Sequence, residues 1–148
     1  MTIDSKNSQA ESYIINIEDL NRAAVINGLD IIGAYTKIGA LYISFVTFTV
    51  STEISISNSN FSSNVCVGGG GGAITTSLFS CNLKISSSSF NGNRAITPLQ
   101  NVIGGKGGAI YLGTQSSSKA MSTISINNCN FTNNAASQYA GALYVYGI

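Results

Sequence analysis

Residues Phe131–Tyr144 read FTNNAASQYAGALY, and two motifs in this stretch decide the fold. The first is Phe-x-x-Asn, which also occurs at Phe61–Asn64 and Phe90–Asn93. An alternating apolar pair precedes each of the three copies, and its first member always stands seven residues before the Phe. The pairs are Ile54/Ile56, Leu83/Ile85 and Ile124/Ile126. One constant offset indicates an internal repeat.

The second motif is a Gly-Gly-Ala-Ile run that follows each copy. Its versions are Gly71–Ile74, Gly107–Tyr111 and Ala140–Tyr144, and Gly39–Tyr42 resembles an earlier copy whose own Phe-x-x-Asn half has decayed. The equivalent glycines are separated by 33, 36 and 33 residues; they are Gly39, Gly72, Gly108 and Gly141. A period in the thirties predicts a solenoid.

The local pattern favours strands over the helices of ankyrin or tetratricopeptide repeats. Ile-Ser-Ile and Leu-Lys-Ile alternate as strands do, and the chain is rich in Gly, Ser, Asn and β-branched residues. We therefore expect an all-β fold, a parallel β-helix of about four rungs. Each rung would hold a strand at Ile-x-Ile, a corner at Phe-x-x-Asn, a strand at Gly-Gly-Ala-Ile-Tyr and a short strand between them.

Stacked rungs give each repeated residue a structural role. Inward phenylalanines would stack on one another, and the corner asparagines would take the left-handed conformation and form a hydrogen-bonded ladder. Glycines at the entry of a strand would permit a bend and a close backbone approach. The predicted residues are Phe61, Phe90 and Phe131, Asn64, Asn93 and Asn134, and Gly72, Gly108 and Gly141. Two inserted loops are expected, at Arg94–Lys106 with Pro98 and at Gly113–Lys119.

These paired motifs resemble the polymorphic outer membrane protein (Pmp-like) repeats, known from chlamydial autotransporter adhesins and from surface proteins of other microbes. The resemblance covers residues 39–148 and leaves residues 1–38 as a degenerate N-terminal rung or cap. It implies a right-handed parallel β-helix, an extracellular or cell-surface location, and a structural or adhesive function. Because the chain finishes on an apparent strand without a polar cap, we expect rungs to stack on it, from a longer solenoid or from a second copy assembling into a filament.

The charges argue against several classes of function. Only 9% of residues are charged and the net charge is +1, which disfavours a nucleic-acid partner. There is no His, and no Asp or Glu follows Glu53, so the sequence lacks the paired carboxylates of β-helix glycosidases and no enzyme is expected. The glycine run Val67–Gly72 lacks the Lys-Ser/Thr of a phosphate loop, so no cofactor is expected. The alternative is a carbohydrate-binding or carbohydrate-processing β-helix, for which a groove of tyrosines such as Tyr111 and Tyr144 would argue.

The cysteines and the apolar stretch leave two questions open. Cys66, Cys81 and Cys129 fit no metal-site spacing and fall in different repeat columns, so free core thiols are favoured over a Cys66–Cys81 disulfide. The stretch Ile31–Val50 is long enough to span a membrane, but Lys37 and the alternation in its second half favour strands.

Two N-glycosylation sequons fall at the same repeat position, at Asn60-Phe-Ser and Asn130-Phe-Thr. If the Phe points inward, the preceding Asn points outward and is accessible to a glycan. Asn60 and Asn130 are therefore candidate glycosylation sites, although two sequons also arise by chance in so Ser/Asn-rich a chain.

Overall fold

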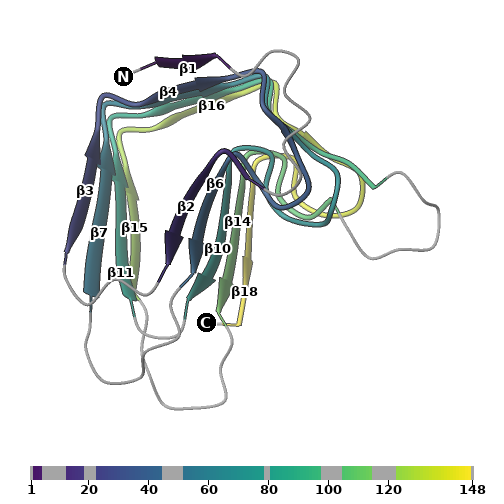
Figure 1. Ribbon diagram of the computed structural model, residues 1–148. Helices are drawn as coiled ribbons and strands as arrows, with labels where there is room; N and C mark the ends of the chain where they lie inside the picture. The colour runs from purple at the N-terminus through teal and green to yellow at the C-terminus, as the bar shows by residue number, and fades with distance from the viewer. Residues whose placement is uncertain are drawn as a thin grey trace.

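The computed structural model describes residues 2–4, 13–18, 23–44, 52–78, 81–97, 105–114 and 123–147. In these residues the chain forms β-strands and no helix, and the strands build four parallel sheets. Figure 1 shows equivalent strands of successive turns lying side by side along one axis. The protein is a parallel β-helix, with four complete rungs and two strands of a further one at the N-terminal side.

Each rung contributes one strand to each sheet, and we name the sheets by their residues. The Ile sheet has β3 (Ala24–Asn27), β7 (Thr52–Ser57), β11 (Cys81–Ser86) and β15 (Thr123–Asn127). The Phe sheet has β1 (Thr2–Asp4), β4 (Asp30–Ile32), β8 (Asn60–Ser62), β12 (Ser89–Asn91) and β16 (Asn130–Thr132). The short sheet has β5 (Tyr35–Thr36), β9 (Val65–Cys66), β13 (Arg94–Ala95) and β17 (Ala135–Ala136). The Tyr sheet has β2 (Ile15–Glu18), β6 (Leu41–Ser44), β10 (Ile74–Leu78), β14 (Ile110–Thr114) and β18 (Leu143–Tyr146).

The register of the sheets follows the sequence repeat. Leu83 pairs with Ile54 and Ile124, and Ile110 pairs with Ile74 and Leu143. We number the complete rungs 1 to 4, beginning at β3, β7, β11 and β15. Rung 1 contains the half-repeat that the sequence does not reveal, because Ile31 of β4 pairs with Phe61 and stands in the phenylalanine column.

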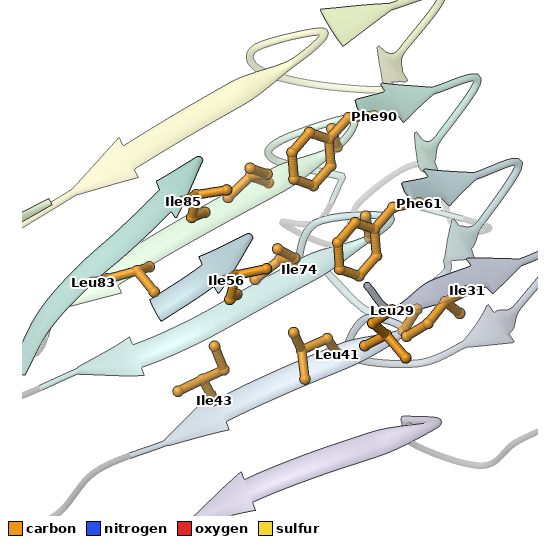
Figure 2. Close-up of a cluster of buried hydrophobic side chains, with 14 of the residues drawn as sticks. Leu29, Ile31, Leu41, Ile43, Ile56, Phe61, Ile74, Leu83, Ile85 and Phe90 are labelled. Atoms are coloured by element: carbon orange, nitrogen blue, oxygen red, sulfur yellow. The ribbon is translucent and has the colours of Figure 1, made fainter. Parts of the chain in front are cut away.

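The core is the space that the rungs enclose. Inward side chains from three sheets meet there and are fully buried in rungs 2 and 3, as Figure 2 shows for Ile56, Phe61, Ile74, Leu83 and Phe90. Burial of aliphatic and aromatic area in every rung supplies the main stabilising term, at about 25 cal/mol per Å² of apolar surface.

The corners differ from the prediction in two ways. Phenylalanine lies in a strand of its own, so a rung has four strands instead of three. The left-handed residue at the next corner is the one before the ladder asparagine and not that asparagine itself: it is Ser63, Gly92 or Asn133. A second left-handed corner precedes the Phe sheet, at Asn58, Ser87 and Asn128. Asn tolerates this conformation because its side chain bonds locally, and glycine because it has no Cβ.

The inserted loops begin later than predicted. Arg94 and Ala95 belong to β13, where they pair with Val65 and Cys66, and Gly113 belongs to β14, where it pairs with Ser77. The parallel ladder fixes these residues, and most of the remainder of each predicted loop falls in residues 98–104 and 115–122, outside the described part of the chain. The described part of the apolar stretch, residues 31–44, contributes to β4, β5 and β6, and no described helix has the length and apolar character needed to cross a membrane.

Candidate functional site

The asparagine column runs through the corner that follows the Phe sheet. The Asn64 Nδ2 group donates to Asn93 Oδ1 at 2.9 Å, and the Asn93 Nδ2 group donates to Asn134 Oδ1 at 3.0 Å. Each oxygen also accepts the backbone N–H of the asparagine one rung earlier, at 3.2 and 2.9 Å. Asn64 and Asn93 are fully buried, so the amides replace the water that these backbone groups would otherwise need. In rung 1 the Ala34 N–H donates to Asn64 Oδ1 at 3.0 Å, so Ala34 occupies the position that asparagine holds in the later rungs.

The phenylalanine column lies one strand earlier. The ring centroids of Phe61 and Phe90 are 5.1 Å apart, and those of Phe90 and Phe131 are 4.8 Å apart, with nearly parallel planes. The spacing of parallel strands imposes this face-to-face stack. The neighbouring Ser59 and Ser88 form a column too, in which the Ser59 N–H donates to Ser88 Oγ at 3.1 Å.

The strand-entry glycines are explained by close approach and not by a left-handed backbone. A Cβ on Gly72 would lie 2.4 Å from the Gly108 carbonyl oxygen, and a Cβ on Gly108 would lie 1.8 Å from the Gly141 carbonyl oxygen. Gly141, in rung 4, has only the Asn134 carbonyl oxygen near it, at 3.2 Å. A side chain is therefore excluded where another rung follows.

The described cysteine side chains are free thiols. Cys66 is fully buried and its Sγ donates to the Lys37 carbonyl oxygen at 3.3 Å, so it makes no disulfide with Cys81. Burial raises the pKa of the Cys66 thiol, against the opposing effect of the Gly68, Gly69 and Gly70 backbone. A buried, protonated thiol is unreactive. Cys129 continues the Ser59–Ser88 column, and its Sγ donates to the Asn127 carbonyl oxygen at 3.3 Å.

The two sequon asparagines lie in the Phe sheet, both paired with Ser89. Asn130 is exposed and Asn60 is half-buried. Phe61, the next residue after Asn60, points to the opposite face of the strand and is fully buried. The side-chain nitrogen of Asn130 is therefore the more accessible of the two.

The outer face of the Tyr sheet carries a column of tyrosines and a cavity. Tyr42, Thr75, Tyr111 and Tyr144 occupy one column of successive rungs. Tyr111 and Tyr144 stack with centroids 5.8 Å apart, and the Lys106 ammonium lies 4.8 Å from the Tyr111 ring centroid. A cavity of about 330 Å³ opens where Thr75 interrupts the column. Its lining includes Tyr42, Tyr111, Ser77 and the loop Gly68–Gly70.

Comparison with known proteins now identifies the repeat. Residues 87–113 match the family model described as the Chlamydia polymorphic membrane protein repeat. Residues 87–113 are a polymorphic membrane protein repeat. It is also 35% identical over 130 residues to the probable autotransporter YfaL of Escherichia coli (strain K12). That alignment covers 87% of this chain but 10% of YfaL, so the chain spans about a tenth of its relative's length. No solved structure matches the chain.

The matched polymorphic membrane protein repeat is one turn of the β-helix. Residues 87–113 run from the corner before β12, through Phe90 and Asn93, to Gly108 and the strand β14. Its recurrent residues are thus the ones that hold one rung on the next. The repeat and the autotransporter relative together indicate a surface-exposed repeat protein.

Sequence reasoning missed the cavity on the Tyr sheet. Tyr111 and Tyr144, the tyrosines named for a groove in the alternative function, lie in one column of the outer face. Tyr42, Thr75 and Gly70 were not singled out. The signal was present in the alignment of the Gly-Ala-Leu-Tyr runs, where Thr75 follows Ile74 at the position that holds tyrosine in the other three copies.

Proposed function

We propose that this chain is a structural and adhesive section of an extracellular or cell-surface β-helix. The observation that supports it best is that some columns of residues recur in successive rungs while others vary. The recurrent Phe, Asn and Gly positions stack rung on rung, while the outward positions of the same strands vary, as Val25, Ser55, Lys84 and Ser125 do in the Ile sheet. Such a scaffold keeps its backbone constant and presents a variable outer surface.

The role is proposed as non-catalytic. Glu53, the last acid in the sequence, is half-buried and pairs with Lys84 of the next rung at 2.8 Å, so it forms a surface ion pair between neighbouring rungs. Release of sugar from any glycan by the purified chain would contradict this part of the proposal.

The partner proposed for the ends is another rung. Ile124, Ile126 and Phe131 of rung 4 are half-buried, whereas Leu83, Ile85 and Phe90, which they pair with, are fully buried. Because this apolar surface has the shape of one rung, a rung of the same β-helix fits it, from the same chain or from a second copy. Light scattering after size exclusion tests the second source: residues 1–148 should associate more as concentration rises, and Phe131→Asn should reduce that association.

Surface display and adhesion are tested together in cells that produce the chain within its full-length protein. Protease added to intact cells should cleave the repeat, and beads coated with residues 1–148 should bind target cells more than beads coated with heat-unfolded chain. Cleavage only after lysis would contradict the surface location, and equal binding of the two bead types would contradict adhesion.

Glycosylation is proposed for both sequon asparagines, which share one strand position of the Phe sheet and are exposed or half-buried. Asn130 is the more exposed in the described residues, and a rung stacked on rung 4 would bring its exposure towards that of Asn60. Glycopeptide mass spectrometry of native material should find the modification at these asparagines. Two bare asparagines in that material would remove the proposal.

A further inference from the structure

The cavity on the Tyr sheet exists because rung 2 lacks two large side chains. In the tyrosine column rung 2 has Thr75, between Tyr42 of rung 1 and Tyr111 of rung 3. Five residues earlier in each rung, Gly70 aligns with Lys106 and Tyr139, since Gly71 pairs with Gly107 and Gly107 with Ala140. Lys106 and Tyr139 cover the tyrosine of their own rungs, with Tyr139 and Tyr144 centroids 4.9 Å apart. Among the four complete rungs, rung 2 is the one that has neither the tyrosine nor its cover.

Hydrogen bonds hold this notch open. The Gly71 N–H donates to Thr75 Oγ1 at 2.8 Å, and the Thr75 hydroxyl donates to the Ile38 carbonyl oxygen. A Cβ on Gly70 would lie 2.0 Å from the Ile38 carbonyl oxygen and 2.2 Å from Thr75 Oγ1, so no side chain fits at that position. The glycine loop is therefore fixed by its contacts, and the notch is preformed, as small-molecule sites commonly are.

The dimensions of the notch select a single ring. Its volume of about 330 Å³ lies at the low end of ligand pockets. Tyr42 and Tyr111 are two rungs apart, which places the backbones of their strands about 9.6 Å from each other at the usual strand spacing. A flat aromatic ring in contact with both would need about 7–8 Å, two contacts of 3.5–4.0 Å. A thicker ring fills the gap better.

The chemistry of the walls selects the kind of ring. The faces of tyrosine rings carry negative electrostatic potential and attract the C–H groups of a pyranose chair. Ser77 and the phenols of Tyr42 and Tyr111 give the lining polar groups for the hydroxyls at the rim of a sugar, and the residues of the described chain that line the notch are uncharged. The Lys106 ammonium, 4.8 Å from the Tyr111 ring centroid, lies beside that wall. We propose that the notch binds one pyranose unit of a glycan between Tyr42 and Tyr111. For its biological use this rests on the adhesion proposed above, but binding is measured in solution, so either proposal can fail without the other.

The test is saturation-transfer NMR on residues 1–148 with methyl glycosides of glucose, galactose, mannose and N-acetylglucosamine. At least one glycoside should bind in the millimolar range. Tyr42→Thr and Tyr111→Thr should each weaken it by about tenfold or more, the loss expected for one stacking face. Thr75→Tyr, which completes the column with both walls in place, should abolish binding. Tyr35→Thr is the matched control, because Tyr35 is an exposed tyrosine of the short sheet and should leave binding unchanged.

The proposal is overturned if none of the four glycosides binds, or if one binds with equal affinity to the chain and to the folded Tyr42→Thr and Tyr111→Thr variants. Binding of p-cresol with the same dependence on both tyrosines, in place of the glycosides, would assign the notch to a flat aromatic and also overturn it. Thermal unfolding of each variant shows whether it is folded, and the two Tyr→Thr variants decide the outcome if Thr75→Tyr does not fold.

Discussion

Replacing Asn93 by Ala should be among the most damaging single changes in the chain. The side chain makes four hydrogen bonds in a fully buried position. Its Nδ2 group donates to the Phe61 carbonyl oxygen and to Asn134 Oδ1, and its Oδ1 accepts from the backbone N–H and the Nδ2 group of Asn64. At about 1 kcal/mol each, their loss lowers the free energy of unfolding by roughly 4 kcal/mol. A domain has about 5–15 kcal/mol in all.

Asn91 provides the matched control two residues away. Its Oδ1 accepts from Thr132 Oγ1 at 2.9 Å and from Asn133 Nδ2 at 3.4 Å, but it is exposed, so water can replace both donors. Urea unfolding followed by circular dichroism should therefore show a loss below about 0.5 kcal/mol for Asn91→Ala. If Asn93→Ala and Asn91→Ala lose the same amount, the asparagine ladder does not stabilise the fold as argued.

Asn93→Asp adds a pH dependence to the same position. A carboxylate there faces the Phe61 carbonyl and Asn134 Oδ1 without a proton to donate, and burial raises its pKa above the unfolded value of about 3.9. The unfolded chain then releases the proton at lower pH than the folded chain, so the destabilisation grows as pH rises from about 4. The free energy of unfolding of Asn93→Asp should lie closer to that of the unsubstituted chain at acid pH than at neutral pH. The corresponding difference for Asn93→Ala should change little with pH.

Three further stability predictions use the same urea assay. Thr76→Val should raise the free energy of unfolding by about 1 kcal/mol, because Thr76 Oγ1 is buried without a hydrogen-bond partner among the described residues; a loss would mean that the hydroxyl is satisfied. Gly108→Ala should cost more than about 3 kcal/mol and Gly141→Ala less than about 1 kcal/mol, since a Cβ meets the next rung only at Gly108; equal costs would contradict the close-approach argument. Phe90→Ala should cost about 3–5 kcal/mol and Phe90→Ile clearly less, because Ile31 already fills that column in rung 1.

The rungs that the sequence predicts are those whose columns hold identical residues. Phe61, Phe90 and Phe131 share one offset from the apolar pair before them, so alignment gives the register that the strand pairing shows. The motif search does not detect rung 1, because Ile31 and Ala34 occupy the Phe and Asn columns. Their side chains fit the columns but do not match the Phe-x-x-Asn motif. Packing at these positions requires a side chain of suitable size, whereas a sequence motif is recognised only when the residue type is the same.

The left-handed corner residues were predicted one position too late for a different reason. The left-handed residue of the corner is Ser63, Gly92 or Asn133 in successive rungs, three residue types that reach the same backbone conformation in different ways. No common residue type marks this position. The asparagine that follows it recurs in rungs 2 to 4, so the sequence motif led to the prediction that the asparagine is the left-handed residue. The ladder hydrogen bonds of that asparagine are conserved between rungs, and the backbone strain is not carried by it.

The notch follows from the same stacking that stabilises the core. In a parallel β-helix an outward side chain touches its own column more than its sequence neighbours, so a smaller residue in one rung leaves a gap whose walls are the residues one rung away on either side. Thr75 and Gly70 create such a gap while β10 keeps its full pairing to β6 and β14. Two substitutions can therefore open a binding site, or close one, with the Phe, Asn and Gly columns untouched. An array of such rungs can change what its surface binds without changing what holds it together.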